Sequence, residues 1–264
     1  MEEESTLTNN NDYQIELLSS QLLFNEAQKL GLQPKWETEY GLFSVKLPSS
    51  SSREFFFHSN LNLNGELSRM LVKNKHFTRL ILEKNGFENI PYLLPSSKKE
   101  LEHFFEQHQP IICKPLLGQR SRSISLISTK RELSHCSLKM TFFEKFIKGD
   151  ECRYLILNNR VIAVQKKRLA PTSSNPWNLH YIGLEKIDWD RQLVKQSLSI
   201  AKLFKLEWVA VDYILDKQNK AWVLEVNSAP GIVKMHQPDE GVKTNVAKLI
   251  WKLMIINSKD HLQE

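Results

Sequence analysis

The chain has 264 residues, of which 41% are hydrophobic and 25% are charged, so it can bury a sizeable core. Its net charge of +6 is spread along the sequence without a block of about five or six like charges, which argues against a dedicated nucleic-acid-binding arm. The three scattered cysteines form no CxxC pair, and no apolar run approaches the length of a membrane span. We therefore expect a cytoplasmic protein, a possible homodimer, that binds neither nucleic acid nor a membrane.

The polar, acidic residues 1–12 predict a disordered tail. Apolar side chains recur at helical spacing over Tyr13–Leu30, which predicts an amphipathic helix that Gly31 ends. Three short apolar segments then predict strands: Lys35–Thr38, Leu42–Leu47 and Phe55–His58. Together these elements predict a short N-terminal α/β domain over residues 13–70.

Helices and strands alternate irregularly in the rest of the chain. Helical patterns cover Met70–Asn85, Ser97–Gln107, Trp189–Phe204 and Val242–Ile255. Strand patterns cover Pro110–Lys114, Ile124–Ile127, Thr141–Lys145, Cys152–Leu157 and Arg160–Lys167. The Asn158-Asn159 pair between the last two strands predicts a two-residue hairpin turn. Antiparallel hairpins mixed with helices indicate an α+β fold.

Near the C-terminus, Val211–Val226 has two apolar runs around a polar stretch, which predicts another β-hairpin. Because side chains alternate faces along a strand, Glu225 and Asn227 point the same way. A turn centred between residues 218 and 219 would place Asp212 opposite Glu225. Two carboxylates and one amide oxygen suit Mg²⁺, whereas the hairpin alone is equally compatible with acids that face water. The sharp Asn-Ser-Ala-Pro-Gly turn that follows favours the metal site.

Possible phosphate contacts occur earlier in the chain. Lys114 ends an apolar strand and could bind a phosphate as a point charge, although such lysines are usually only solvated. The loop Gly118–Ser123 lies between two strands and could lay backbone N–H groups over phosphates. It contains one glycine, so it is a weak phosphate-loop signal.

The segment Phe142–Arg153 predicts a strand, a break at a glycine and a second strand. An unpaired strand edge at the break could offer an N–H and a C=O to a purine, with Phe146 and Ile147 in apolar contact. Glu151 could then accept hydrogen bonds from ribose hydroxyls. The alternative is that Glu144 and Glu151 are surface acids paired with nearby lysines.

A cationic run, Lys166-Lys167-Arg168, closes the strand that follows. Strand alternation sends Lys167 to one face and its two neighbours to the other. A cationic pair here could neutralise charge on a transferring phosphoryl group, and a solvated strand end is the alternative.

These motifs occur in the order found in ATP-grasp ligases, which the chain resembles over roughly residues 13–255. It is most similar to the grasp domain of cyanophycin synthetases and bifunctional glutathione synthetases. The resemblance is carried by Asn74-Lys75, Lys114, Glu144-Lys145-Phe146-Ile147 with Gly149 and Glu151, Asp212, Glu225–Gly231, Met235-His236, Glu240-Gly241 and Asn245-Val246-Ala247. Arg168 with Asn178-Leu179-His180 also resembles the ribosomal-protein glutamylating ligases.

The resemblance implies an ATP-grasp fold, in which two α+β subdomains, here residues 71–145 and 146–264, grip ATP. It implies a carboxylate–amine ligase that forms an acyl phosphate, releases ADP and phosphate, and acts on a small-molecule or peptide carboxylate with an amine co-substrate. The implied nucleotide-binding residues are Lys75, Lys114, Glu144, Lys145, Phe146, Ile147 and Glu151. The implied Mg²⁺ ligands are Asp212, Glu225 and Asn227. The implied catalytic residues, facing the acyl phosphate and the substrate carboxylate, are Arg122, Arg153, Arg168 and Asn178.

Two features depart from the family pattern. Ser121 and Ser123 stand where glycine is expected, and serine allows backbone to approach phosphate less closely. The part before Lys75 is short, which favours an open pocket for a large or peptide substrate. The alternatives are a nucleotide-binding protein that has lost catalysis and a nucleic-acid-binding domain, the latter supported only by a pI of about 9.1.

Overall fold

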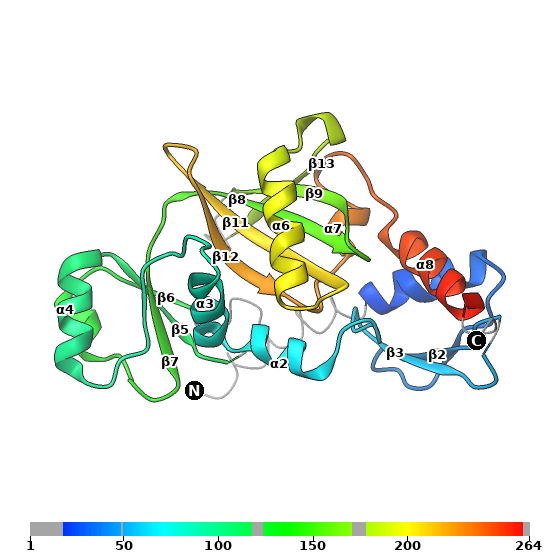
Figure 1. Ribbon diagram of the computed structural model, residues 1–264, viewed down its shortest axis with the longest axis horizontal. Helices are drawn as coiled ribbons and strands as arrows, with labels where there is room; N and C mark the ends of the chain where they lie inside the picture. Colours follow the sequence, from blue (N-terminus) through cyan, green and yellow to red (C-terminus); the bar gives the residue numbers. More distant parts are fainter. Residues whose placement is uncertain (1–17, 49, 118–123, 171–177, 261–264) are drawn as a thin grey trace.

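The computed structural model describes residues 18–48, 50–117, 124–170 and 178–260, which form three sheets with helices packed against them (Figure 1). The predicted tail, residues 1–12, lies outside the described residues. The mixture of antiparallel strands and helices confirms the α+β class. Within the described ranges, no helix is both long enough and apolar enough to cross a membrane.

The N-terminal sheet has three antiparallel strands in the order β1-β2-β3: β1 Lys35–Trp36, β2 Leu42–Val45 and β3 Glu54–Phe57. A helix over residues 18–29 and the C-terminal helix α8 (Val246–Asp260) complete this unit. Leu23, Phe43 and Trp251 belong to one buried cluster, and the Trp251 indole N–H donates to the Leu23 carbonyl at 2.8 Å. The first and last parts of the chain therefore share a core (blue and red in Figure 1).

A second, antiparallel sheet has the strand order β4-β7-β5-β6: β4 Tyr92–Leu93, β5 Ile111–Pro115, β6 Ser125–Ile127 and β7 Thr141–Lys145. Helix α4 (Lys98–His108) covers one face with Leu101 and Phe104. It begins at Ser97, the first residue of the predicted helix, whose hydroxyl accepts the Glu100 N–H at 3.2 Å and caps the helix. A short helix, α5 (Lys130–Ser134), follows β6.

The predicted single helix over Met70–Asn85 is wrong, because the chain forms two helices there, α2 (Glu66–Lys73) and α3 (Lys75–Lys84). Asn74 between them has an extended backbone, which ends α2, and its Oδ1 accepts the Phe77 N–H at 3.2 Å, which caps α3. The cap makes Lys75 the first residue of α3.

The third sheet has six strands in the order β12-β11-β8-β9-β10-β13, antiparallel except for the β10–β13 pair. Its strands are β8 Gly149–Leu157, β9 Arg160–Leu169, β10 Leu179–Gly183, β11 Trp208–Asp216, β12 Ala221–Asn227 and β13 Glu240–Gly241. Asn158 and Asn159 both have positive φ, which confirms the predicted turn between β8 and β9. Gly149 must be glycine, because a Cβ there would lie 1.9 Å from the Leu215 carbonyl oxygen.

The two faces of the six-stranded sheet differ. One packs on helix α6 (Arg191–Leu203) through apolar side chains that include Tyr154 and Tyr213. The other is apolar at one end, where Leu155 and Trp208 join the core of the N-terminal unit, and polar at the opposite end. The remaining short helices are η1 (Lys186–Asp188) and α7 (Val233–His236). The subdomain boundaries at 70/71 and 145/146 remain predictions.

Candidate active site

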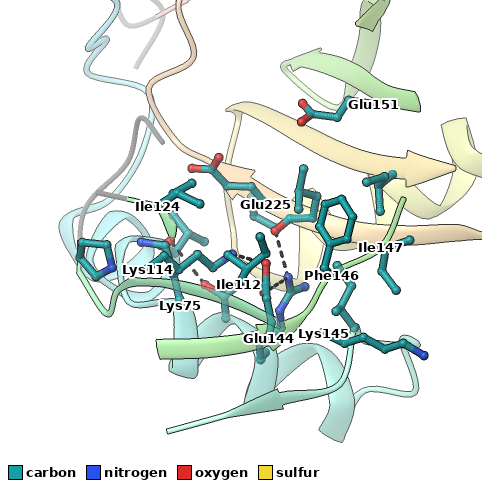
Figure 2. A pocket seen from close by; sticks show the side chains of 18 of the residues that line it. Lys75, Ile112, Lys114, Ile124, Glu144, Lys145, Phe146, Ile147, Glu151 and Glu225 are labelled. Carbon is teal, nitrogen blue, oxygen red and sulfur yellow. Dashed lines mark hydrogen bonds and ion pairs between the residues drawn. The ribbon is translucent and has the colours of Figure 1, made fainter. Parts of the chain in front are cut away.

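A cavity of about 420 Å³ lies among the four-stranded sheet, helix α3 and the hairpin of β11 and β12 (Figure 2). Its volume is within the range of small-molecule sites. The lining includes every residue predicted to bind the nucleotide: Lys75, Lys114, Glu144, Lys145, Phe146, Ile147 and Glu151. It also includes Glu225, one of the predicted metal ligands.

One side of the cavity is cationic. Lys114 is 7% exposed, and its Nζ donates to Glu144, which is 2% exposed. Burial opposes ionisation of Glu144, but Lys114 and Arg79 together hold the pKa of this carboxyl below its ordinary value. Burial, and then the proximity of Lys114, lower the pKa of Lys75. Glu144 is therefore a buried counterion, and the surface-acid alternative is wrong for this residue.

The segment between β7 and β8 is only partly as predicted. The Lys145 N–H donates to Pro91 O at 2.9 Å and the Phe146 N–H to Pro110 O at 3.0 Å, so neither is free to meet a purine. The Lys145 side chain points away from the cavity, whereas Phe146 and Ile147 form part of its apolar wall (Figure 2).

The hairpin pairs Asp212 directly opposite Glu225, which confirms the predicted register. The route differs: the pairs Leu215–Ala221 and Tyr213–Val223 centre the turn on residue 218, and a β-bulge then shifts the register by one. Leu224 is the extra residue, since it is skipped between the pairs on either side. Asn227 pairs with Ala210, two residues from Asp212, so the three predicted metal ligands share one face.

Asp212 is 2% exposed and is held by two cations. Arg153 donates Nε to Oδ1 at 2.7 Å and Nη2 to Oδ2 at 2.6 Å, and Lys167 Nζ lies 3.2 Å from Oδ2. Burial opposes ionisation, but Arg153 and Lys167 outweigh it and lower the pKa of Asp212 to about 2. Lys167 also donates to Glu151 at 3.0 Å. The Asp212 face is thus an ionic network that joins β8, β9 and β11.

Glu225 contrasts with its neighbour. Burial, and then the charge of Asp212, raise its pKa. Among the described residues its carboxylate has no hydrogen-bonding or ion-pair partner. A divalent cation between Glu225 and Asp212 would offset this charge, and Asn227 would add an amide oxygen while its Oδ1 also accepts the Ala229 N–H at 3.0 Å.

The side-chain oxygens of Asp212, Glu225 and Asn227 suit Mg²⁺ as an incomplete set of ligands. Within the described part of the chain, no three His, Cys, Asp or Glu side chains form a metal-binding group. The set is instead two carboxylates and one amide, which leaves coordination positions to water and to phosphate oxygens, as Mg²⁺ commonly requires.

Comparison with known proteins identifies the family to which this site belongs. The RimK-like ATP-grasp domain family matches residues 72–254. The chain belongs to this family. A D-alanine–D-alanine ligase from Clostridium beijerinckii is 26% identical over 188 residues, which are 64% of this chain and 62% of that ligase. The chain thus spans about 62% of the length of that curated relative.

Solved structures agree on the fold. A bifunctional glutathione synthetase from Pasteurella multocida superposes with a TM-score of 0.67 at 12% identity, over 91% of this chain and 44% of that one. The ATP-grasp ligase PsnB, complexed with a minimal precursor, superposes with a TM-score of 0.64 at 15% identity, over 75% of this chain and 63% of that one. The predicted ATP-grasp fold and the resemblance to glutathione synthetases are confirmed.

Not every predicted catalytic residue of this ATP-grasp chain lies at the cavity. Arg153 does belong to the Asp212 network. Arg168 lies on the opposite face of β9, 55% exposed, with its Nε 3.4 Å from Asp150 Oδ2. The reason is strand alternation, which brings Lys167 to the Asp212 face instead. Asn178 donates to the Ala170 carbonyl at 3.1 Å, where β9 ends and β10 begins. Arg122, with the rest of the loop Gly118–Ser123, lies outside the described residues.

Sequence reasoning missed one buried residue of the ATP-grasp site and left another without a role. For Lys167, the sequence predicts only that it faces away from Lys166 and Arg168. Whether it shares a face with Asp212 depends on how the strands pair. Arg79 follows Lys75 by one helical turn, so both lie on one side of α3. A charged side chain near Leu82, on the buried side of this amphipathic helix, was the available signal for Arg79.

Proposed function

We propose that this chain is an ATP-dependent ligase that joins a carboxylate to an amine through an acyl phosphate. The observation that carries the proposal is the polarity of the cavity. Lys75, Lys114 and Glu225 gather where phosphates and a metal ion would lie, and Phe146 and Ile147 form an apolar wall where a base would lie. Family membership supports the same chemistry.

The roles of the nucleotide-binding residues follow from their contacts. Lys75 and Lys114 would hold phosphates as point charges. Adenine would pack on Phe146 and Ile147, and the Ile147 N–H would be the backbone donor, because the two preceding N–H groups are already bonded. Glu151 would accept hydrogen bonds from the ribose while Lys167 orients it.

Asp212, Glu225 and Asn227 would hold one or two Mg²⁺, which supply positive charge to the phosphate oxygens. PsnB has been solved with Mg and ADP, which supports this part of the proposal. Asp212 and Glu151 already balance the charges of Arg153 and Lys167, so these two cations would attract the substrate carboxylate once Mg²⁺ offsets the charge of Asp212.

The reaction then balances as two displacements. A substrate carboxylate oxygen attacks the γ-phosphorus, the bond from that phosphorus to the bridging oxygen breaks, and ADP leaves. The amine next attacks the acyl carbon, phosphate leaves, and the new amide nitrogen gives up a proton. The protein contributes position, charge and the exclusion of water.

We propose that the substrate is a small-molecule or peptide carboxylate. PsnB has been solved with a precursor peptide, which supports the peptide class. The test is to incubate the chain with ATP, Mg²⁺ and pooled amino acids or peptides, and to measure ADP and phosphate. A carboxylate labelled with ¹⁸O should transfer one label to the released phosphate. ATP binding without ADP release would favour a non-catalytic nucleotide-binding protein, and absence of ATP binding would reject both.

A further inference from the structure

Arg79 is buried, at 3% exposure, and none of the roles above uses it. Its Nη2 donates to Glu144 Oε2 at 3.0 Å and to the Leu224 carbonyl at 3.0 Å, and its Nη1 donates to the Val223 carbonyl. One guanidinium therefore connects α3, β7 and β12.

The two carbonyls that Arg79 binds belong to consecutive residues. In a regular strand, consecutive carbonyls point to opposite edges, so one side chain does not reach both. Val223 and Leu224 lie at the bulge of β12, the outer strand of its sheet, where the ladder is interrupted. A buried carbonyl without a donor is costly, so Arg79 stabilises the bulge. The bulge in turn sets Glu225 opposite Asp212.

The other contact of Arg79 leads to the phosphate side of the cavity. Glu144 accepts from Arg79 through one oxygen and from Lys114 through the other. The guanidinium thereby fixes the direction of the Glu144 carboxylate, which fixes Lys114. Lys114 and Glu225 belong to different sheets. Arg79 contacts the carboxylate that holds Lys114 and the backbone carbonyls that precede Glu225.

We propose that Arg79 is a positioning residue that sets the register of Glu225 and the orientation of Lys114 together. The inference rests on the proposed function only in that it takes Lys114 and Glu225 to bind phosphate and metal. Lysine cannot replace the planar fork that spans two carbonyls and a carboxylate, so Arg79→Lys should restore the site only in part.

The first test measures the affinity for ADP and its Mg²⁺ requirement by calorimetry. Arg79→Met should raise both the Kd and the Mg²⁺ concentration for half-maximal binding, by about 10- to 100-fold, with Arg79→Lys intermediate. Glu144→Gln keeps the carbonyl contacts, so it should raise the Kd but leave the Mg²⁺ requirement unchanged. Lys84→Met, an exposed change on the same helix, should alter neither. An unchanged Mg²⁺ requirement in both Arg79 variants would overturn the proposal.

The second test needs no nucleotide. Amide hydrogen exchange in peptides covering β12 should accelerate in Arg79→Met while that of β8 stays unchanged, because Arg79 bonds only to β12 of these two strands. If Arg79→Met does not fold, Arg79→Lys is used in its place. Unchanged exchange in β12 overturns the role of Arg79, whereas a wild-type chain that binds no nucleotide overturns the proposed function instead.

Discussion

Replacing Asp212 by Asn should destabilise the fold in a way that depends on pH. The carboxylate is 2% exposed, and a fall of its pKa from 3.8 to about 2 corresponds to about 2 to 3 kcal/mol of stability at neutral pH. The variant also leaves Arg153 and Lys167 facing each other without their shared counterion. Removing one partner of a buried ion pair typically costs about 3 to 5 kcal/mol, so we expect a loss of that size at pH 7.

The sign of the pH dependence follows from the direction of each pKa. The folded pKa of Asp212 lies below its unfolded value, so its contribution is present above about pH 4 and is lost as the pH falls toward 2. Glu225 is the reverse case: its folded pKa is raised, so its effect on stability becomes unfavourable as the pH rises through that value. The difference in unfolding free energy between wild type and Asp212→Asn should therefore shrink in acid. Glu225→Gln should be no less stable than wild type at pH 7.

The assay is urea unfolding of the metal-free wild type and both variants at pH 7, 5, 4 and 3, followed by circular dichroism. Glu225→Gln is the matched control, because it removes a carboxylate from the same face without breaking an ion pair. A difference in unfolding free energy below about 1 kcal/mol between wild type and Asp212→Asn at pH 7 would refute the reasoning, since an exposed ion pair contributes that much. The reasoning would also be refuted if this difference in unfolding free energy did not become smaller between pH 5 and pH 3.

Further outcomes are expected if the cavity works as proposed. Lys114→Met should weaken ATP binding, and an unchanged affinity by calorimetry would contradict its role. Glu225→Gln should abolish ADP formation while unfolding stays cooperative, and near-normal turnover would contradict the metal site. Lys167→Met should lower turnover, whereas Arg168→Met, the matched change on the opposite face, should not; equal effects would reject this assignment. Ser121→Gly should preserve ADP release if the loop acts through its backbone, and a collapse of activity would show that the hydroxyl is needed.

Local signals in the sequence predicted the longer elements well. Ser97 marks the start of α4, and the Asn158-Asn159 pair marks the β8–β9 turn, because capping and positive φ are properties of single residues. The short strands β10 and β13 were not predicted. β13 has two residues, Glu240 and Gly241, and is a strand only because it pairs with β10, so its own sequence carries no period to detect.

The candidate site was predictable to a different degree. The predicted nucleotide-binding residues, such as Lys114 and Glu151, all line the cavity. They were predicted from the order of motifs that the chain has in common with ATP-grasp ligases. The ionic partners within the site were not found. Arg79 is 65 residues from Glu144 and 144 from Val223, and such pairings come from the packing of separate sheets rather than from any local pattern.

The register of the hairpin shows why a correct pairing can rest on an incomplete reason. A regular hairpin with its turn centred between residues 218 and 219 would pair Asp212 with Glu225, but it would also pair Tyr213 with Leu224. The structure pairs Tyr213 with Val223, so Val223 joins the core beneath α6 and Leu224 lines the cavity. Val223 and Leu224 are both apolar, and their sequence cannot indicate which of them faces the core. What distinguishes them is external to the hairpin: Arg79 bonds the carbonyls of both, a contact that a regular strand would not offer, so the bulge and the buried arginine stabilise one another.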